Sequence, residues 1–80
     1  MRALGAVIRA RRLRLKKTCG DIALRSGLSE AAIVQAERRD PSLDLLQLAA
    51  IAAALEIPLR TLLRRAERKI RRGRKKRKPR

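Results

Sequence analysis

TCGDIALRSGLSEAAIVQAE, residues 18–37, is the stretch that decides the fold of this chain. Thr18 precedes a helical pattern and Asp21 follows three positions later, which is the spacing of a capping box at the start of a helix. Gly27 suits the left-handed residue that ends a helix, because glycine has no Cβ to clash in that conformation. Ser29 is again an N-cap residue type. The stretch therefore predicts two short helices joined by a glycine turn.

Apolar residues stand where these two helices are expected to meet. Ala23 lies at the crossing, which needs a small side chain, and Leu28 fills the core beneath the turn. The residues expected to face inward on the two helices are Ile22, Ala23, Ile33 and Ala36. Two short helices joined by a turn of about three or four residues that contains glycine form a helix-turn-helix. Any helical hairpin shares this spacing, so the flanking sequence has to decide its meaning.

The flanking segments predict three more helices, and no strand pattern competes with them. A first helix covers roughly residues 3–16. Asp40 and Pro41 predict the start of a fourth, with proline in the first helical position. Pro58 starts a fifth helix and Gly73 ends it. The expected inner faces are Leu4, Val7, Ile8 and Leu15 on the first helix, and Leu45, Leu48, Ala49, Ala52 and Leu55 on the fourth.

The charge balance indicates an anionic partner. The chain has 23 Lys and Arg against 7 Asp and Glu, a net charge of +16. A field of this sign concentrates polyanions at the surface, so nucleic acid is the first candidate and an anionic membrane the second. An RNA-binding role stays open. The absence of Phe, Tyr and Trp argues against single-strand modules, which stack bases on aromatic rings.

Residue usage also excludes several function classes. With no His and a single cysteine, Cys19, zinc sites, His-based acid–base catalysis and an internal disulfide are not expected. We therefore expect no enzyme, no metal and no cofactor. No apolar run has transmembrane length and no convincing secretory segment is present, so we expect no membrane partner and a cytoplasmic, nucleoid-associated protein of a bacterium or phage.

Residues 4–63 resemble the phage repressor and Cro type of helix-turn-helix family, also called Xre-like. The matching pieces, in order, are LGAVIRARR (4–12), TCGDIALRSGLSEAAIVQAER (18–38), PSLDLLQLA (41–49) and ALEIPLRTLL (54–63). The resemblance implies an all-α, five-helix, lambda-repressor-like DNA-binding domain over residues 1–72, with the motif at about 18–37. Residues 73–80 would follow as a basic, disordered tail. Members of the family usually bind operator DNA as two-fold dimers.

Four positions depart from the family pattern. Cys19 stands where the family usually has a glutamine that touches DNA, and Lys17 where it usually has an apolar residue. Arg39 replaces a glycine after the reading helix, and Pro41 falls about two residues early. We therefore expect a shorter loop and a longer fourth helix than in the family.

The helix that begins near Ser29 holds the expected base-reading residues. Gln35 lies on its outer face, and an amide can bond adenine in a bidentate way. The resemblance implies that Glu30 and Ala31 take the first base-contacting positions, where a carboxylate accepts from cytosine and a methyl touches thymine. Glu30 is equally explained by the positive end of the helix dipole. For Gln35 simple solvation is the alternative, and base reading is the favoured interpretation.

A larger set is expected to contact phosphates. It comprises Thr18, Cys19, Ser29, Arg38, Arg39, Arg74, Lys75, Lys76, Arg77 and Lys78. Capping alone also explains Thr18 and Ser29, and solvation explains the arginines. Ten of the thirteen residues from 68 to 80 are Lys or Arg, a composition typical of nucleic-acid tails.

The resemblance also implies two structural roles. Arg12 and Glu37 would form an ion pair between the first helix and the reading helix. A homodimer would assemble through the fifth helix, although an apolar stripe of this kind is more often core than interface. That stripe comprises Leu59, Leu62, Leu63, Ala66 and Ile70.

Together these features predict a sequence-specific regulator of transcription, a repressor, that binds double-stranded DNA with the helix of residues 29–38. A sequence-tolerant nucleoid or RNA-binding protein is one alternative. A protein-interaction subunit of the antitoxin kind is the other.

Overall fold

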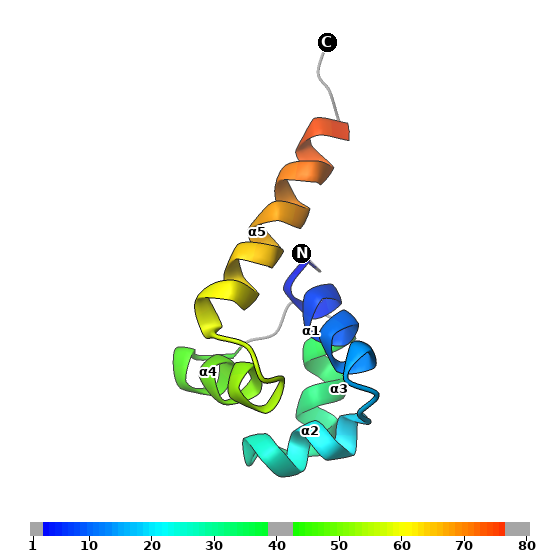
Figure 1. Cartoon of the computed structure of the whole chain (residues 1–80), viewed down its shortest axis with the longest axis vertical. Coiled ribbons are helices and arrows are strands. Elements are labelled where there is room, and N and C mark those ends of the chain that lie inside the picture. The colour runs from blue at the N-terminus through cyan, green and yellow to red at the C-terminus, as the bar shows by residue number, and fades with distance from the viewer. Residues whose placement is uncertain (1–2, 39–42, 77–80) are drawn as a thin grey trace.

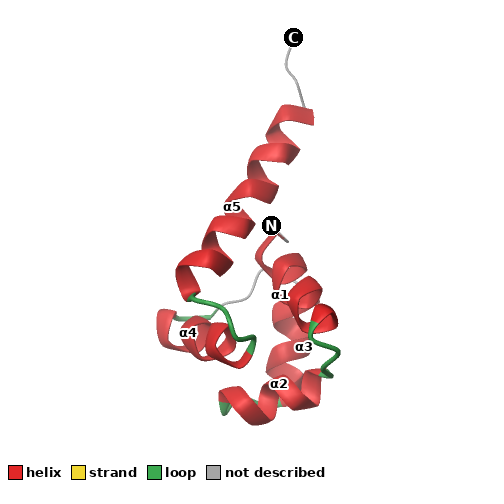
Figure 2. Ribbon diagram, viewed as in Figure 1, coloured by secondary structure: helices red, strands yellow, loops and turns green. Residues whose placement is uncertain are grey.

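The structure is a computed structural model that describes residues 3–38 and 43–76, without the side chains of 73–76. Within these residues there are five helices and no strand, which confirms the all-α class and the helix count. The helices are α1 (Ala3–Arg14), α2 (Cys19–Ser26), α3 (Glu30–Arg38), α4 (Leu45–Ala54) and α5 (Leu59–Lys76) (Figures 1 and 2).

Helix α1 is the central element of the arrangement. It packs against α3 on one side and against α5 on another, while α2 packs against both α3 and α4 (Figure 1). Helix α5 rises past the N-terminal end of α1 and extends beyond it, which gives the molecule its long dimension of 47 Å against 23 and 20 Å. The pair of helices α2 and α3 is thus joined to α5 through α1 and also through α4.

The core is aliphatic and every helix contributes to it. Its fully buried large side chains are Ile8, Ile22, Ile33, Ile51, Leu55 and Leu62. Isoleucine predominates, and its branched Cβ leaves few rotamers to lose on folding, which suits a core built without aromatic rings. The four residues expected to face inward from α2 and α3 are all buried.

The ends of α2 follow the local signals of the sequence. Thr18 Oγ1 accepts from the Asp21 N–H at 3.0 Å, and Asp21 Oδ2 accepts from the Thr18 N–H at 2.8 Å. Gly27 has a φ of 79°, and its N–H donates to the Ala23 carbonyl at 2.9 Å. Ser29 Oγ accepts from the Ala32 N–H at 3.1 Å and caps α3. The predicted capping box, glycine cap and second N-cap are confirmed.

Helix α4 begins later than predicted. It starts at Leu45, so the prediction of a start at Asp40 and Pro41 is wrong; those two residues lie outside the described part of the chain. Asp44 Oδ1 accepts from the Gln47 N–H at 2.8 Å, and Gln47 Oε1 accepts from the Asp44 N–H at 3.1 Å. This second capping box satisfies two backbone donors, whereas a proline at the first position satisfies none. Helix α4 is therefore shorter than expected.

The predicted inner face of α4 is also partly wrong. Leu45 is 66% exposed and Ala49 is exposed, whereas Ile51 and Ala54 are buried together with Ala52. Except for Gln47, every residue of this helix is apolar, so periodicity offers no contrast between its faces. Contacts with α2 and α5 decide which face is buried.

Helix α5 does not end at Gly73. It continues to Lys76, so the predicted boundary between helix and tail is wrong; residues 77–80 lie outside the described part. A glycine inside a helix costs only about 1 kcal/mol relative to alanine and keeps its backbone donor. The surrounding arginines and lysines favour the helical conformation, so the helix passes through this position.

No single helix among the described residues is both long and apolar enough to cross a membrane. Helices α4 and α5 pass that test only as a pair, and they are bent by 99° with respect to each other.

Gly5 permits the close approach of α1 and α3. A Cβ at this position would lie 2.5 Å from the carbonyl oxygen of Ala36 and 2.7 Å from that of Glu37. Both obstacles are backbone atoms, which cannot rotate aside as a flexible side chain can. The packing of α1 on α3 therefore requires glycine here.

We expect Gly5→Ala to destabilise the protein by about 1–3 kcal/mol, because the added methyl forces the two helices apart. Chemical denaturation measures the loss. Gly20→Ala is the matched control, since its Cβ meets nothing closer than 3.6 Å. This change should stabilise α2 by about 0.5–1 kcal/mol through the lower backbone entropy of alanine in the unfolded chain. Equal effects of the two substitutions would contradict the close-packing interpretation.

The capping box also predicts a pH dependence. The hydrogen bonds from Thr18 hold the pKa of the Asp21 carboxylate below its ordinary value. A carboxylate with a lowered pKa stabilises the fold above its unfolded-state pKa, and this contribution disappears as the pH falls through the folded-state value. We expect the melting temperature of Asp21→Asn to fall less steeply than that of the wild type below about pH 4. Parallel profiles of the two proteins would show that the capping carboxylate has no such role.

Candidate nucleic-acid interface

Helix α3 exposes the residues that the sequence predicted as base readers. Its inner face is buried through Ile33 and Ala36, while Glu30, Ala31 and Gln35 are exposed. Positions 31 and 35 are four residues apart and share one face of the helix, with position 30 beside them. The three side chains are thus available together on the outer surface.

The expected ion pair between α1 and α3 is present and nearly buried. Arg12 Nε donates to Glu37 Oε2 at 2.6 Å, and Arg12 Nη2 donates to Glu37 Oε1 at 3.0 Å. The two side chains are 12% and 6% exposed. Arg12 Nη1 also donates to the Lys17 carbonyl at 2.9 Å. One guanidinium therefore joins α1, the loop before α2 and α3, and its bonds to Glu37 raise the pKa of Arg12.

Cys19 belongs to this network rather than to the outer surface. Its half-buried thiol lies 3.7 Å from Glu37 Oε2, the same oxygen that accepts from Arg12. Burial raises the pKa of the Cys19 thiol, and the negative charge of Glu37 raises it further. The structure thus gives this thiol a contact with Glu37. The predicted contact of Cys19 with phosphate stays a prediction.

The other predicted phosphate-contacting residues divide into two groups. Thr18 and Ser29 are exposed, and their hydroxyl oxygens act as helix caps. Arg38 is exposed in the last turn of α3. Outside the described part of the chain lie Arg39, Arg77 and Lys78, and also the side chains of Arg74, Lys75 and Lys76, whose backbones belong to α5.

The stripe predicted as a dimer interface is mostly core. Leu62 and Ala66 are only 0% and 8% exposed, and Leu59 packs against the buried cluster. Ile70 is half-buried, and Leu63 alone is an exposed member, at 42%. Of the five residues, Leu62 and Ala66 thus belong to the core of one chain, because α1 and α4 pack against α5. The homodimer itself stays a prediction.

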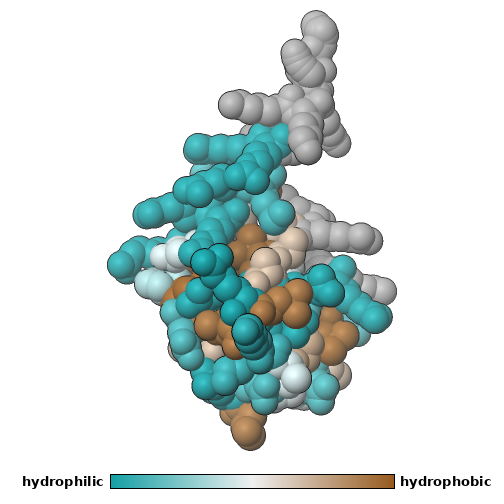
Figure 3. Space-filling model, turned by 45° about the vertical axis from the view of Figure 1, so that its right-hand side comes forward, coloured by the Kyte–Doolittle hydropathy of each residue, from teal (hydrophilic) through white to brown (hydrophobic). Residues whose placement is uncertain are grey.

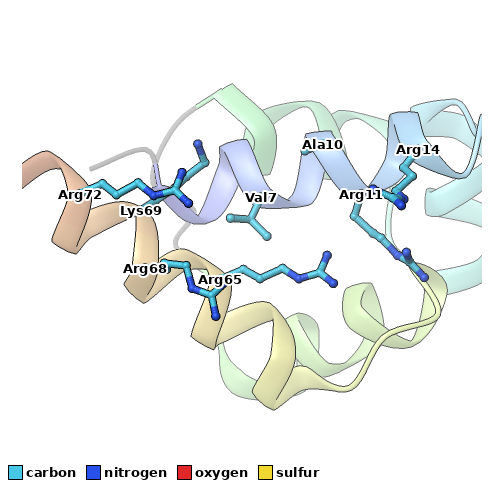
Figure 4. A pocket seen from close by; sticks show the side chains of 8 residues that line it. All are labelled: Val7, Ala10, Arg11, Arg14, Arg65, Arg68, Lys69 and Arg72. Atoms are coloured by element: carbon cyan, nitrogen blue, oxygen red, sulfur yellow. The ribbon is translucent and has the colours of Figure 1, made fainter.

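Packing of α1 on α5 creates a basic cleft that the sequence analysis missed. The cleft has a volume of about 280 Å³, and Val7 and Ala10 form its apolar floor (Figure 4). Its charged lining comprises Arg11, Arg14, Arg65, Arg68, Lys69 and Arg72. Basic and apolar residues alternate on both helices in the sequence, and this pattern could have indicated the cleft. Only the packing of α1 on α5 makes their two rows of basic residues face each other. In the space-filling view, hydrophilic side chains cover α5 down to the apolar patches below it (Figure 3).

No family model matches the chain, and no curated protein matches its sequence. In the described residues, no cluster of three or more His, Cys, Asp or Glu side chains could hold a metal ion.

The Arg12–Glu37 pair makes a prediction about stability. Glu37→Gln should cost about 3–5 kcal/mol, because it leaves a nearly buried guanidinium without its counter-charge. Denaturant unfolding measures this cost. Glu67→Gln is the matched control: Glu67 pairs with Arg71 at 3.2 Å on the surface, with the two side chains 61% and 73% exposed. Exposed pairs of this spacing contribute about 0.3–0.5 kcal/mol.

A double variant tests the same role of the Arg12–Glu37 pair in a second way. Replacing both partners with apolar residues of similar length, Arg12→Met and Glu37→Leu together, should recover part of the lost stability. If Glu37→Gln costs no more than Glu67→Gln, the pair does not hold α3 in place.

Proposed function

We propose that this protein binds double-stranded DNA with α3 in the major groove and represses transcription. In this proposal it is a helix-turn-helix regulator of the phage repressor and Cro type, with a lambda-repressor-like arrangement of its five helices. The observation that carries the proposal is the outer face of α3, which offers Glu30, Ala31 and Gln35 on a short helix fixed at both sides.

Rigidity of α3 supports this role. A reading helix has to present its side chains to base edges at a defined angle, and the major groove admits one α-helix. Gly27 sets the turn before α3, and the bidentate bond from Arg12 to Glu37 fixes its last turn. Gly5 brings α1 against the backbone of this same turn. Three separate constraints thus hold the helix from its start to its end.

Charge supports a division of labour between the helices. The outer face of α3 carries one acid, Glu30, and one base, Arg38, so it contributes little attraction to phosphates. Exposed cations stand on α1 and α5 outside the cleft, among them Arg9, Arg60 and Arg64, and the net charge is +16. Phosphate contacts position a protein on the duplex, whereas contacts with base edges select the sequence. A repressor bound across a promoter would then exclude the polymerase.

The same charge distribution favours a second candidate function. If binding depends on the cations of α1 and α5 alone, the protein binds nucleic acid without sequence preference, as nucleoid and some RNA-binding proteins do. The face of α3 would then be a solvated surface. The two candidates differ in whether a preferred sequence exists.

Selection from a pool of random duplexes tests the proposal. Enrichment of a defined motif is the expected result, and it would give the site for further measurements. Recovery of duplexes with no common sequence would overturn the proposal and favour the sequence-tolerant candidate. Competition with RNA in the same assay distinguishes a nucleoid protein, which binds DNA, from an RNA-binding protein.

On the selected site, Gln35→Ala should weaken binding by about 1–3 kcal/mol and relax the preference at one base position. The reason is the loss of a bidentate amide contact. Fluorescence anisotropy on the selected duplex and on its single-base variants measures both effects. Arg38→Gln is the control, because losing a phosphate contact should weaken binding evenly on all sequences. An even loss for Gln35→Ala would show that this residue does not select bases.

A further inference from the structure

The cleft between α1 and α5 has the composition of an anion-binding site. Arg11 and Arg14 line it from α1, and four further cations line it from α5 (Figure 4). Among the described residues that line it, none is acidic. Glu67, an acid of α5, lies outside the lining and pairs with Arg71. The two basic walls therefore face each other with no negative side chain between them.

The apolar floor of the cleft strengthens the positive electrostatic field inside it. Val7 is only 5% exposed and forms an apolar surface with Ala10 between the charged rows. A cleft lined by charges of one sign and backed by a low-dielectric wall focuses field lines and concentrates counter-ions. An anion in this position would also relieve the repulsion between α1 and α5. Binding would therefore stabilise the fold.

One of the guanidinium groups is held in place. Arg11 Nε donates to the Leu55 carbonyl at 2.9 Å, and Arg11 Nη2 donates to the Glu56 carbonyl at 3.3 Å. These bonds anchor the guanidinium at the turn between α4 and α5, so its position costs little entropy when a ligand binds. The Nε–Nη2 edge of Arg11 is thereby occupied, so bidentate contacts with phosphate, to which planar arginine forks are suited, would come from the arginines of α5.

The cleft lies on a different side of α1 from the reading helix. Gly5 and Arg12 mark the side that packs towards α3. Val7, Arg11 and Arg14 mark the side that lines the cleft. With 3.6 residues per turn, the centres of these two sides lie about 140° apart around the helix axis. A ligand in the cleft and a duplex on α3 would therefore occupy separate surfaces.

We propose that this cleft binds a compact polyphosphate, such as inorganic tripolyphosphate or the triphosphate group of a nucleotide. This proposal goes beyond DNA binding by α3 and does not depend on it. The volume of about 280 Å³ falls just below the range of roughly 300–1,000 Å³ that drug-sized ligands fill. It therefore suits a short phosphate chain, with the base of any nucleotide outside.

Calorimetric titration of the full chain with sodium tripolyphosphate, without DNA, tests the proposal. Arg65→Gln together with Arg68→Gln removes two cations from the cleft and should raise the Kd by about tenfold or more. Arg60→Gln together with Arg64→Gln is the matched control, because it removes two exposed cations of α5 that do not line the cleft. This control should change the Kd by no more than about twofold at a salt concentration near 0.15 M. Circular dichroism verifies that both double variants remain folded.

Equal losses in the two double variants would overturn the proposal, since diffuse net charge would then explain the binding. Titration with adenosine triphosphate identifies the source of the phosphates: binding as tight as that of tripolyphosphate means that a nucleotide can supply the chain. The last experiment uses a short DNA duplex as a competitor of tripolyphosphate. If the duplex displaces tripolyphosphate, and only the cleft variant loses duplex affinity, the cleft contacts nucleic-acid backbone and the compact-ligand proposal is overturned. Because tripolyphosphate binding is measured without DNA, a negative result would leave the proposed function of α3 unaffected.

Discussion

The nearly buried ion pair between Arg12 and Glu37 is the interaction on which the rest of the structure depends. Its guanidinium bonds both oxygens of one carboxylate and a backbone carbonyl in the loop before α2. Charges removed from water are stable only while all their partners stay in position. Helix α3 is therefore held where its last turn meets α1, and the Cys19 thiol completes the contact through the same carboxylate. The direction in which α3 presents its outer face follows from this network.

Helix α1 packs against both α3 and α5, and these two contacts organise the molecule. On one side Gly5 lets it approach the backbone of α3, and on another Val7 and Ala10 meet α5. The second contact contributes to the burial of Leu62 and Ala66 on α5. It also brings the basic residues beside these apolar stripes together as one cleft. Burial of the stripe and formation of the cleft are thus two consequences of a single helix contact.

Local signals in the sequence succeeded where one short-range interaction governs the outcome. The capping hydroxyl of Thr18, the left-handed conformation of Gly27 and the cap at Ser29 involve only residues within about four positions of each other. The same kind of signal failed where two candidates compete. Asp44 and Gln47 make two hydrogen bonds with each other, and α4 begins there rather than at the proline further upstream. A single glycine in α5 was too weak to end a helix rich in arginine and lysine.

By itself, the sequence determined the five helices, the inward faces of α2 and α3 and the caps that separate these two helices, because each depends on backbone conformation and on apolar spacing within one segment. The family pattern proposed from the sequence indicated the pairing of Arg12 with Glu37. Only the tertiary structure decided which face of the apolar helix α4 is buried, what covers the stripe of α5, and that arginines of α1 and α5 share a cleft. The reason is physical: periodicity shows that a helix has an apolar side, but the partner of that side, and the charges gathered at its edges, depend on how the helices cross.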